Sequence, residues 1–166
     1  MSTDLAFLAR PFSQTVFDGM LALNNQFAAE LSFLQAEGFS ALLMGASHVQ
    51  ATAGGAAFIV AFNDECHYEN PNFHWLKQHY QRFYYIDRVV VGEDMRGRGV
   101  ARQFYAHLEV LARAEGRERL VCEINAIPPN PISDGFHKAL GFEIVGEQYL
   151  AQKDKTVRYW AKEFLP

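Results

Sequence analysis

Residues 94–104, DMRGRGVARQF, combine clustered arginines with two glycines just before an amphipathic segment. At Gly97 and Gly99 a bulky anion can approach the main chain, because glycine has no side chain. Amides at the start of a helix point outward, and the helix dipole there favours negative charge. The arginines that add donors for a phosphate are Arg96, Arg98 and Arg102. The stretch indicates a pyrophosphate site at a helix start, and a solvated surface turn is the alternative.

Two common nucleotide motifs do not fit this stretch. A P-loop needs Gly-Lys-Ser/Thr, which does not follow the glycines here. A dinucleotide-binding GxGxxG needs a third glycine, but Arg102 stands at that position. An anion site at this place therefore requires a strand before the stretch and a helix after it.

The neighbouring residues predict a strand and a helix at these places. FYYIDRVVV, residues 83–91, is dense in aromatic and β-branched residues and is typical of a strand. Gly116 suits the end of the following helix. One face of that helix is formed by Val100, Phe104, Leu108 and Leu111.

A second strand and a second helix follow. RLVCEIN, residues 119–125, has an apolar run that fits a central, buried strand. A short helix over 130–142 would begin with Asn130 as its N-cap and Pro131 in its first turn. Gly141 suits its C-terminal end.

The remaining elements complete an α/β pattern in what we predict to be a single domain, residues 1–166. Ser32 is the expected N-cap of one helix, and Gly54-Gly55 is the expected turn of a hairpin. In chain order we expect helices over 12–25 and 31–47, a hairpin over 48–63, an irregular loop over 64–82, and strands over 142–150 and 155–164.

Composition limits the function classes. The net charge is -4 and no basic stripe is present, so nucleic acid is not an expected partner. No stretch suits a membrane helix or a signal peptide. We therefore expect a cytoplasmic protein whose two cysteines are reduced. The Cys and His residues between 64 and 82 match no zinc spacing, so no metal is expected.

Residues 83–142 resemble the GNAT superfamily of N-acetyltransferases. The family pattern Gln/Arg-x-x-Gly-x-Gly/Ala is matched by Arg96, Gly99 and Ala101, and NPISDGFHKALGF is similar to the family's late helix. HWLKQHYQRFYYIDRVVV, residues 74–91, and CEINAIPPNP, residues 122–131, also resemble an uncharacterised bacterial subgroup of predicted acetyltransferases. The resemblance implies a central, mixed, mostly antiparallel twisted sheet of about six to seven strands, flanked by helices.

The resemblance also implies acetyl-CoA as co-substrate. Its pantetheine is expected to lie between the strands 83–91 and 119–125, which would splay apart to admit it. The cofactor-binding residues implied in this way are Val89, Val90, Val91, Arg96, Gly97, Arg98, Gly99, Val100, Ala101, Arg102, Asn130, Phe136 and His137.

The implied reaction is direct attack of an amine, on a small molecule or a peptide, on the thioester in a ternary complex. The family's proton donor to the leaving thiolate is a tyrosine, and His137 stands at that position. His137 either takes over this role or only packs there. The change from tyrosine to histidine motivates the alternative of a non-catalytic acyl-CoA-binding sensor or interaction module. A homodimer is left open by the resemblance.

Candidates for the catalytic base lie on the two strands. Strand alternation places residues 85, 87, 89 and 91 on one face, which brings Tyr85 and Asp87 together. Arg88 would then point to the opposite face and be a poor partner for Asp87. Glu123 raises the same question on the next strand, because a buried carboxylate needs either a partner or a function. A structural ion pair is the alternative for both carboxylates.

The aromatic residues of the 64–82 segment have two interpretations. They either cover the acceptor pocket or fill a small hydrophobic cluster beneath a long loop. These residues are Tyr68, Phe73, Trp75 and Tyr80.

Overall fold

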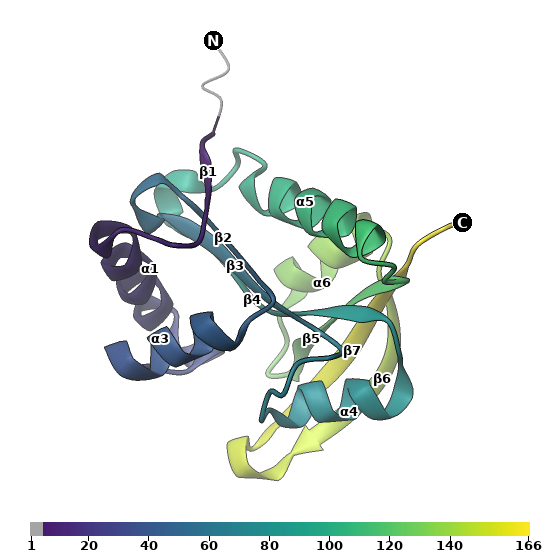
Figure 1. The fold of residues 1–166 in the computed structure, drawn as a ribbon. Coiled ribbons are helices and arrows are strands. Elements are labelled where there is room, and N and C mark those ends of the chain that lie inside the picture. Colours follow the sequence, from purple (N-terminus) through teal and green to yellow (C-terminus); the bar gives the residue numbers. More distant parts are fainter. Residues whose placement is uncertain (1–4) are drawn as a thin grey trace.

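The computed structural model describes residues 5–166, so the first four residues of the predicted domain lie outside the described range (Figure 1). The described residues form a seven-stranded sheet in the order β1-β2-β3-β4-β5-β7-β6. Among the strand pairs of the described residues, only β4–β5 is parallel. The mixed, mostly antiparallel sheet is confirmed. Its strands are β1 (Phe7–Ala9), β2 (His48–Thr52), β3 (Ala57–Asn63), β4 (Phe83–Val91), β5 (Arg119–Ile127), β6 (Glu143–Leu150) and β7 (Lys155–Glu163).

Helices cover both faces of the sheet, and each face has its own hydrophobic core (Figure 1). The first core joins the sheet to α1, α3 and α4, and the second joins it to α5 and α6. None of the helices within residues 5–166 has the length and apolarity needed to cross a bilayer. The helices are α1 (Gln14–Gln26), α2 (Ala28–Leu31), α3 (Ala36–Gly45), α4 (Pro71–His79), α5 (Val100–Ala114) and α6 (Pro131–Ala139).

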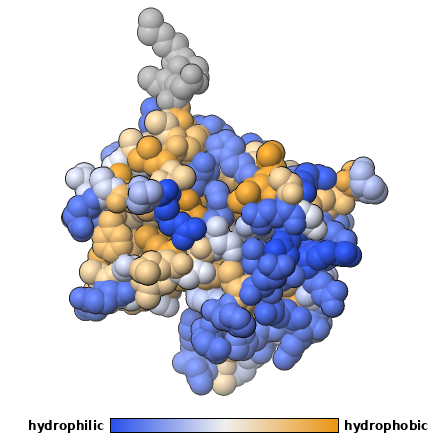
Figure 2. All heavy atoms as spheres, viewed as in Figure 1, coloured by the Kyte–Doolittle hydropathy of each residue, from blue (hydrophilic) through white to orange (hydrophobic). Residues whose placement is uncertain are grey.

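Figure 2 shows that hydrophilic and hydrophobic residues are unevenly distributed over this face of the surface. It is mostly hydrophilic over α4 and the β6–β7 hairpin, and more hydrophobic over α1 and α3.

Glycines bring the backbone of α1 close to the β2–β3 turn. A Cβ atom on Gly19 would lie 2.0 Å from the carbonyl oxygen of Gly54. This contact fixes α1 across the sheet, with its C-terminal end toward β4.

The predicted second helix begins later than expected. The backbone of Ser32 has φ 91°, so Ser32 cannot cap a helix that starts beside it; its N–H closes α2 on Ala28 instead. The side chain of Asn25 then holds Leu34 through both its oxygen and its nitrogen, at 3.0 and 2.9 Å. α3 therefore begins at Ala36, and the single helix predicted over 31–47 is wrong at its start.

The predicted irregular loop over 64–82 contains α4, which is a second correction. Asn70 caps this helix by accepting hydrogen bonds from the amides of Asn72 and Phe73, and Pro71 occupies the first turn. The same Asn-Pro signal was recognised at Asn130-Pro131, where Asn130 accepts from the amide of Ser133 at 3.2 Å. The polar, aromatic composition of the segment hid a helix start that the sequence does contain.

Candidate active site

The neighbouring strands β4 and β5 separate after three residue pairs. They pair only at Phe83–Arg119, Tyr84–Leu120 and Tyr85–Val121. From Ile86 to Val91, the edge of β4 that faces β5 has no strand partner within the described residues. Unpaired main-chain donors and acceptors on such an edge can bind an extended ligand. The predicted splaying of these strands is confirmed.

A β-bulge in β4 lies at the point of separation. Val60 and Ala61 of β3 pair with Arg88 and Ile86 of β4, so Asp87 between them has no paired residue on β3. The bulge shifts the alternation of side chains by one residue. Tyr85 packs in the core beneath α1, α3 and α4, whereas Val89 and Val91 pack toward α5. The prediction that residues 85, 87, 89 and 91 share one face is therefore wrong.

Asp87 is held in a buried ion pair. Arg88 Nε donates to Asp87 Oδ2 at 2.6 Å, and the two side chains are 9% and 3% exposed. Arg88 Nη1 also donates to Asn24 Oδ1 of α1 at 2.8 Å, and the Tyr68 hydroxyl donates to Asp87 Oδ1 at 2.7 Å. Arg88, predicted to be a poor partner, is thus the direct partner of Asp87. Regular strand alternation predicts Arg88 on the opposite face from Asp87, but the bulge interrupts this alternation and brings the two side chains together.

Glu123 lies near this cluster without sharing its hydrogen bonds. Its Oε2 atom and the Tyr85 hydroxyl are both inaccessible to solvent and have no hydrogen-bond partner within residues 5–166. Burial, and then the charge of Asp87, raises the pKa of Glu123 to about 8. Burial and the nearby Glu123 hold the pKa of Tyr85 well above its usual value. The two groups are close enough to affect each other, but no hydrogen bond of ordinary geometry joins them.

The segment between β3 and α4 contributes aromatic rings to this face. Tyr68 stacks on Phe62 with 3.9 Å between ring centroids, and Trp75 stacks on Tyr159 at 4.0 Å. Phe73 is fully buried in the core. The predicted hydrophobic cluster is confirmed for these rings, and Tyr68 in addition contacts Asp87.

His137 lies between α6 and α5, with both ring nitrogens engaged. Nδ1 lies 2.8 Å from the carbonyl oxygen of Ser133, and Nε2 lies 2.7 Å from the Tyr105 hydroxyl. A carbonyl can only accept, so Nδ1 carries the hydrogen and Nε2 accepts from Tyr105. Burial lowers the pKa of His137, which favours this neutral form.

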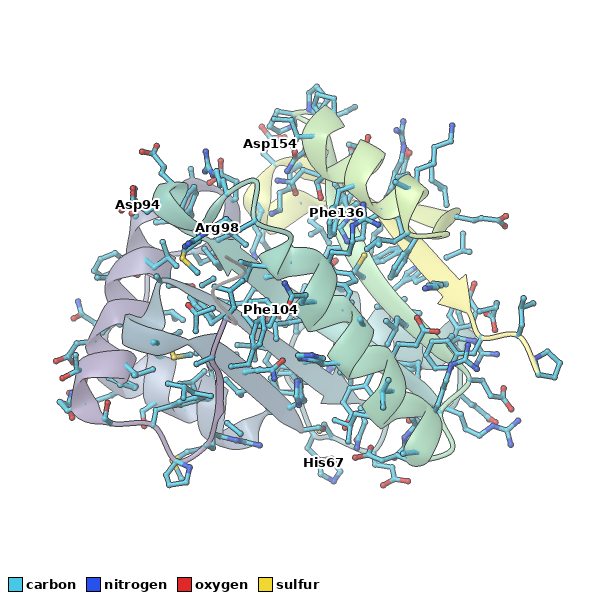
Figure 3. All side chains as sticks on the ribbon, turned by 90° about the horizontal axis from the view of Figure 1, so that it is seen from above. His67, Asp94, Arg98, Phe104, Phe136 and Asp154 are labelled. Atoms are coloured by element: carbon cyan, nitrogen blue, oxygen red, sulfur yellow. The ribbon has the colours of Figure 1, made fainter. Side chains whose placement is uncertain are left out.

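The start of α5 presents open main chain. Gly97 and Gly99 have φ 71° and 72°, and a Cβ atom on either would contact nothing within 4 Å. Within the described residues, the amides of 97–99 donate to no other backbone group. Amides in the first turn of a helix lack intrahelical acceptors as well. Figure 3 shows Arg98 in this turn and Phe136 on the neighbouring α6.

The remaining predicted residues lie around the gap. Asn130 caps α6, and Phe136 packs edge-to-face on Tyr105 at 5.4 Å. Arg96 lies over the ring of Phe27, 5.7 Å from its centroid. No three His, Cys, Asp or Glu side chains of residues 5–166 gather as a metal site would require. The ligand roles predicted for these residues stay predictions.

The acetyltransferase (GNAT) family model matches residues 32–142, about two thirds of the sequence. The chain belongs to the GNAT family. Among curated protein sequences, none matches it.

Solved structures of the GNAT fold resemble this chain at low identity. A CoA complex of an aminoglycoside 6'-N-acetyltransferase is 14% identical, with a TM-score of 0.72 over 98% of both chains. Ard1 from Thermoplasma volcanium is 17% identical, with a TM-score of 0.70 over 98% of this chain and 100% of that chain. An acetyl-CoA complex of a putative streptothricin acetyltransferase from Bacillus anthracis is 21% identical, with a TM-score of 0.54. This match covers 72% of this chain and 63% of that protein's chain.

Three residues of the site were not singled out in the sequence. Asn24 and Tyr105 lie on helices, where nothing in the local pattern distinguishes them from ordinary packing residues. Tyr159 lies on β7 opposite Glu123. Its hydroxyl is within reach of the Asn72 and Gln148 side-chain oxygens, at 2.9 and 2.7 Å. All three act through partners distant in sequence, which no local signal reveals.

The raised pKa of Glu123 predicts a pH-dependent stability. The pKa is about 8 in the folded protein and about 4.3 in an unfolded chain. Between these values the folded state binds the extra proton, so stability decreases as the pH rises through this window. In urea unfolding from pH 4.5 to 9, the free energy of unfolding of Glu123→Gln should increase relative to that of wild type by a few kcal/mol as the pH rises through the window. The exposed Glu143→Gln is the control, and parallel curves for Glu123→Gln and wild type would contradict the buried-carboxyl assignment.

Proposed function

We propose that the protein transfers an acetyl group from acetyl-CoA to an amine by direct attack in a ternary complex. One observation carries this proposal: β4 separates from β5 next to a helix start with open amides. A ligand with a peptide-like arm and a pyrophosphate could use both features at once. As part of this proposal, we expect residues 1–166 to form a single domain and the protein to be cytoplasmic.

The cofactor would lie along the α5 side of the gap. The amide groups of its pantetheine would pair with the free edge of β4 at Val89–Val91. Its pyrophosphate would accept hydrogen bonds from the amides of Gly97 to Arg102 at the start of α5. The side chains Arg96, Arg98 and Arg102 would add charge-assisted contacts, and α6 with Asn130 and Phe136 would close the other wall.

The amine would approach from the α1 and α4 side of the sheet. Glu123 and Tyr85 offer it two buried polar atoms that have no partner in the described chain. An amine with a pKa near 10 is protonated at neutral pH and must lose a proton before it can attack. A carboxylate whose pKa is about 8 can take that proton near physiological pH. We therefore assign the base to Glu123, and an amide of β4 would stabilise the oxyanion.

Asp87 and Tyr85 take supporting roles in this proposal. Both oxygens of Asp87 are occupied by Arg88 and Tyr68, so Asp87 is less available as a base. Its charge instead helps to raise the pKa of Glu123. Tyr85 has a pKa well above its usual value and stays protonated, so its hydroxyl can contact the amine but cannot act as the base.

The second candidate is a non-catalytic module that binds acyl-CoA. The state of His137 favours it, because neither ring nitrogen has a proton available for a leaving thiolate. Both candidates predict binding of acetyl-CoA. Only the first predicts release of free thiol when acetyl-CoA is mixed with small-molecule and peptide amines.

A substitution at Gly99 tests the cofactor site. Gly99→Ala should weaken the binding of acetyl-CoA at least tenfold in isothermal titration, because the new methyl group would stand where the pyrophosphate lies. Gly116→Ala is a matched control: Gly116 has φ 73°, has the same open surroundings and lies just beyond the other end of α5. Both variants bear the same backbone strain, of about 1 kcal/mol. Equal affinities for the two variants would place the pyrophosphate elsewhere.

A substitution at Glu123 tests the assignment of the base. Turnover of an accepted amine should rise with pH through an apparent pKa close to 8 in wild type. Glu123→Gln should lower kcat by about 10² to 10⁴, with little change in acetyl-CoA affinity. Free thiol is measured with a chromogenic reagent at fixed acetyl-CoA. A wild-type protein that binds acetyl-CoA and releases no thiol with any amine would favour the non-catalytic candidate.

A further inference from the structure

We propose that Tyr105 of α5 donates the proton to the departing CoA thiolate, and that His137 is the positioning residue that aims its hydroxyl. This inference rests on the proposed function and adds a catalytic residue to it. Tyr105 lies outside the glycine-arginine stretch and outside the strands that carry the candidate bases. Tyr105 is 4% exposed, and its hydroxyl points from α5 toward His137 of α6.

The hydrogen-bond network fixes which atom holds the available proton. Nδ1–H of His137 is committed to the carbonyl oxygen of Ser133, and Nε2 accepts from the Tyr105 hydroxyl. His137 therefore has no hydrogen to offer toward the gap in this arrangement. The hydrogen of the Tyr105 hydroxyl can turn from Nε2 to another acceptor by rotation about a single C–O bond.

The position of Tyr105 relative to the gap supports its role. Cys122 is the first residue of β5 beyond the last pair with β4, so it marks the point where the strands separate. Cys122 and Tyr105 belong to the same buried cluster, and Cys122 affects the pKa of Tyr105. An acyl-CoA whose arm lies between the strands would place its sulfur near this point.

The titratable groups around Tyr105 come from three elements besides the far face of the sheet. β5 contributes Cys122, and α6 contributes His137, whose own neighbour is Asp134. A pocket beside Tyr105 is also lined by Arg102 and Glu109 of α5 and by Lys162 of β7, and Glu123 acts from the other face of β5. Burial first, and then Cys122 and Glu123, hold the pKa of Tyr105 well above its usual value. Tyr105 is thus a neutral donor over the working pH range.

The proton inventory balances. The neutral amine forms the new C–N bond while the C–S bond breaks, and the electron pair of that bond leaves on sulfur. The hydroxyl hydrogen of Tyr105 passes to this sulfur and gives the CoA thiol. Before the attack, the first proton of the ammonium passes to Glu123 and from there to solvent. The proton that the nitrogen loses as the amide forms then passes to the Glu123 carboxylate. After the products leave, Glu123 releases this proton to solvent and Tyr105 regains one from solvent.

The test needs no acceptor, because product CoA carries the thiol itself. Isothermal titrations of CoA and acetyl-CoA are run at pH 7.0 and 9.5, where a large share of a free alkyl thiol is ionised at the higher value. The variant is Tyr105→Phe, and the control is Tyr84→Phe. Tyr84 lies in the same core, but its hydroxyl donates to Glu115 at 2.9 Å. His137→Phe tests the positioning role.

Tyr105→Phe should weaken CoA binding about tenfold at pH 9.5 and less than about twofold at pH 7.0, because only the thiolate needs the donor. Acetyl-CoA binding should not change, and Tyr84→Phe should resemble wild type. His137→Phe should show a smaller loss, also confined to pH 9.5. A loss in Tyr105→Phe that is equal at both pH values would overturn the proposal. Failure of wild type to bind either ligand would overturn the proposed function as well.

A measurement without a change at Tyr105 covers the case in which Tyr105→Phe does not fold. In Glu123→Gln, which removes the nearby carboxylate charge, thiolate absorbance reports the pKa of bound CoA. We expect this pKa to lie below that of free CoA. A bound pKa equal to or above the free value would overturn the proposal.

Discussion

The β-bulge at Asp87 is the feature on which the rest of the site depends. A bulged strand bends and twists away from its neighbours, and β4 leaves β5 directly before this point. The bulge also turns Asp87 toward Arg88, where Tyr68 and Asn24 complete their hydrogen bonds. A buried ion pair is stabilising only when its geometry is good and its remaining polar atoms have partners. Here those partners come from α1 and from the segment before α4, so two elements that cover the same face of the sheet are tied to the bulge.

The same shift of alternation divides the site into two sides. Beyond the bulge, Val89 and Val91 face α5, whereas Tyr85 before it faces α1 and α4. The main-chain edge and the open helix start therefore lie together on one side, and the carboxylates lie on the other. Glu123 keeps a proton that an ordinary exposed carboxyl would lose, because it is buried near a second carboxylate. In our proposal this separation brings the thioester and the amine together from opposite sides of the sheet.

Much of this architecture can be predicted from local signals. The strand over 83–91, the helix after Gly99 and the cap at Asn130 follow from side-chain shape and backbone preference, and all three are present. The bulge could not be predicted, because it depends on the register of β3 against β4. The misplacement of Arg88 follows from that omission. The Tyr105–His137 hydrogen bond likewise joins residues 32 positions apart. Local patterns thus predict the elements and the candidate residues. The register of the strands and the tertiary packing determine which of those side chains come into contact.

The central claim is that the CoA arm occupies the gap between β4 and β5 with its pyrophosphate at the start of α5. The most direct measurement is a map of backbone amide chemical shifts during titration of the ¹⁵N-labelled protein with CoA. Our account predicts the largest changes at the amides of Gly97–Arg102 and Val89–Val91, with smaller changes along α6. Large changes confined to α4 and the β6–β7 hairpin, with the amides of Gly97–Arg102 unmoved, would contradict it.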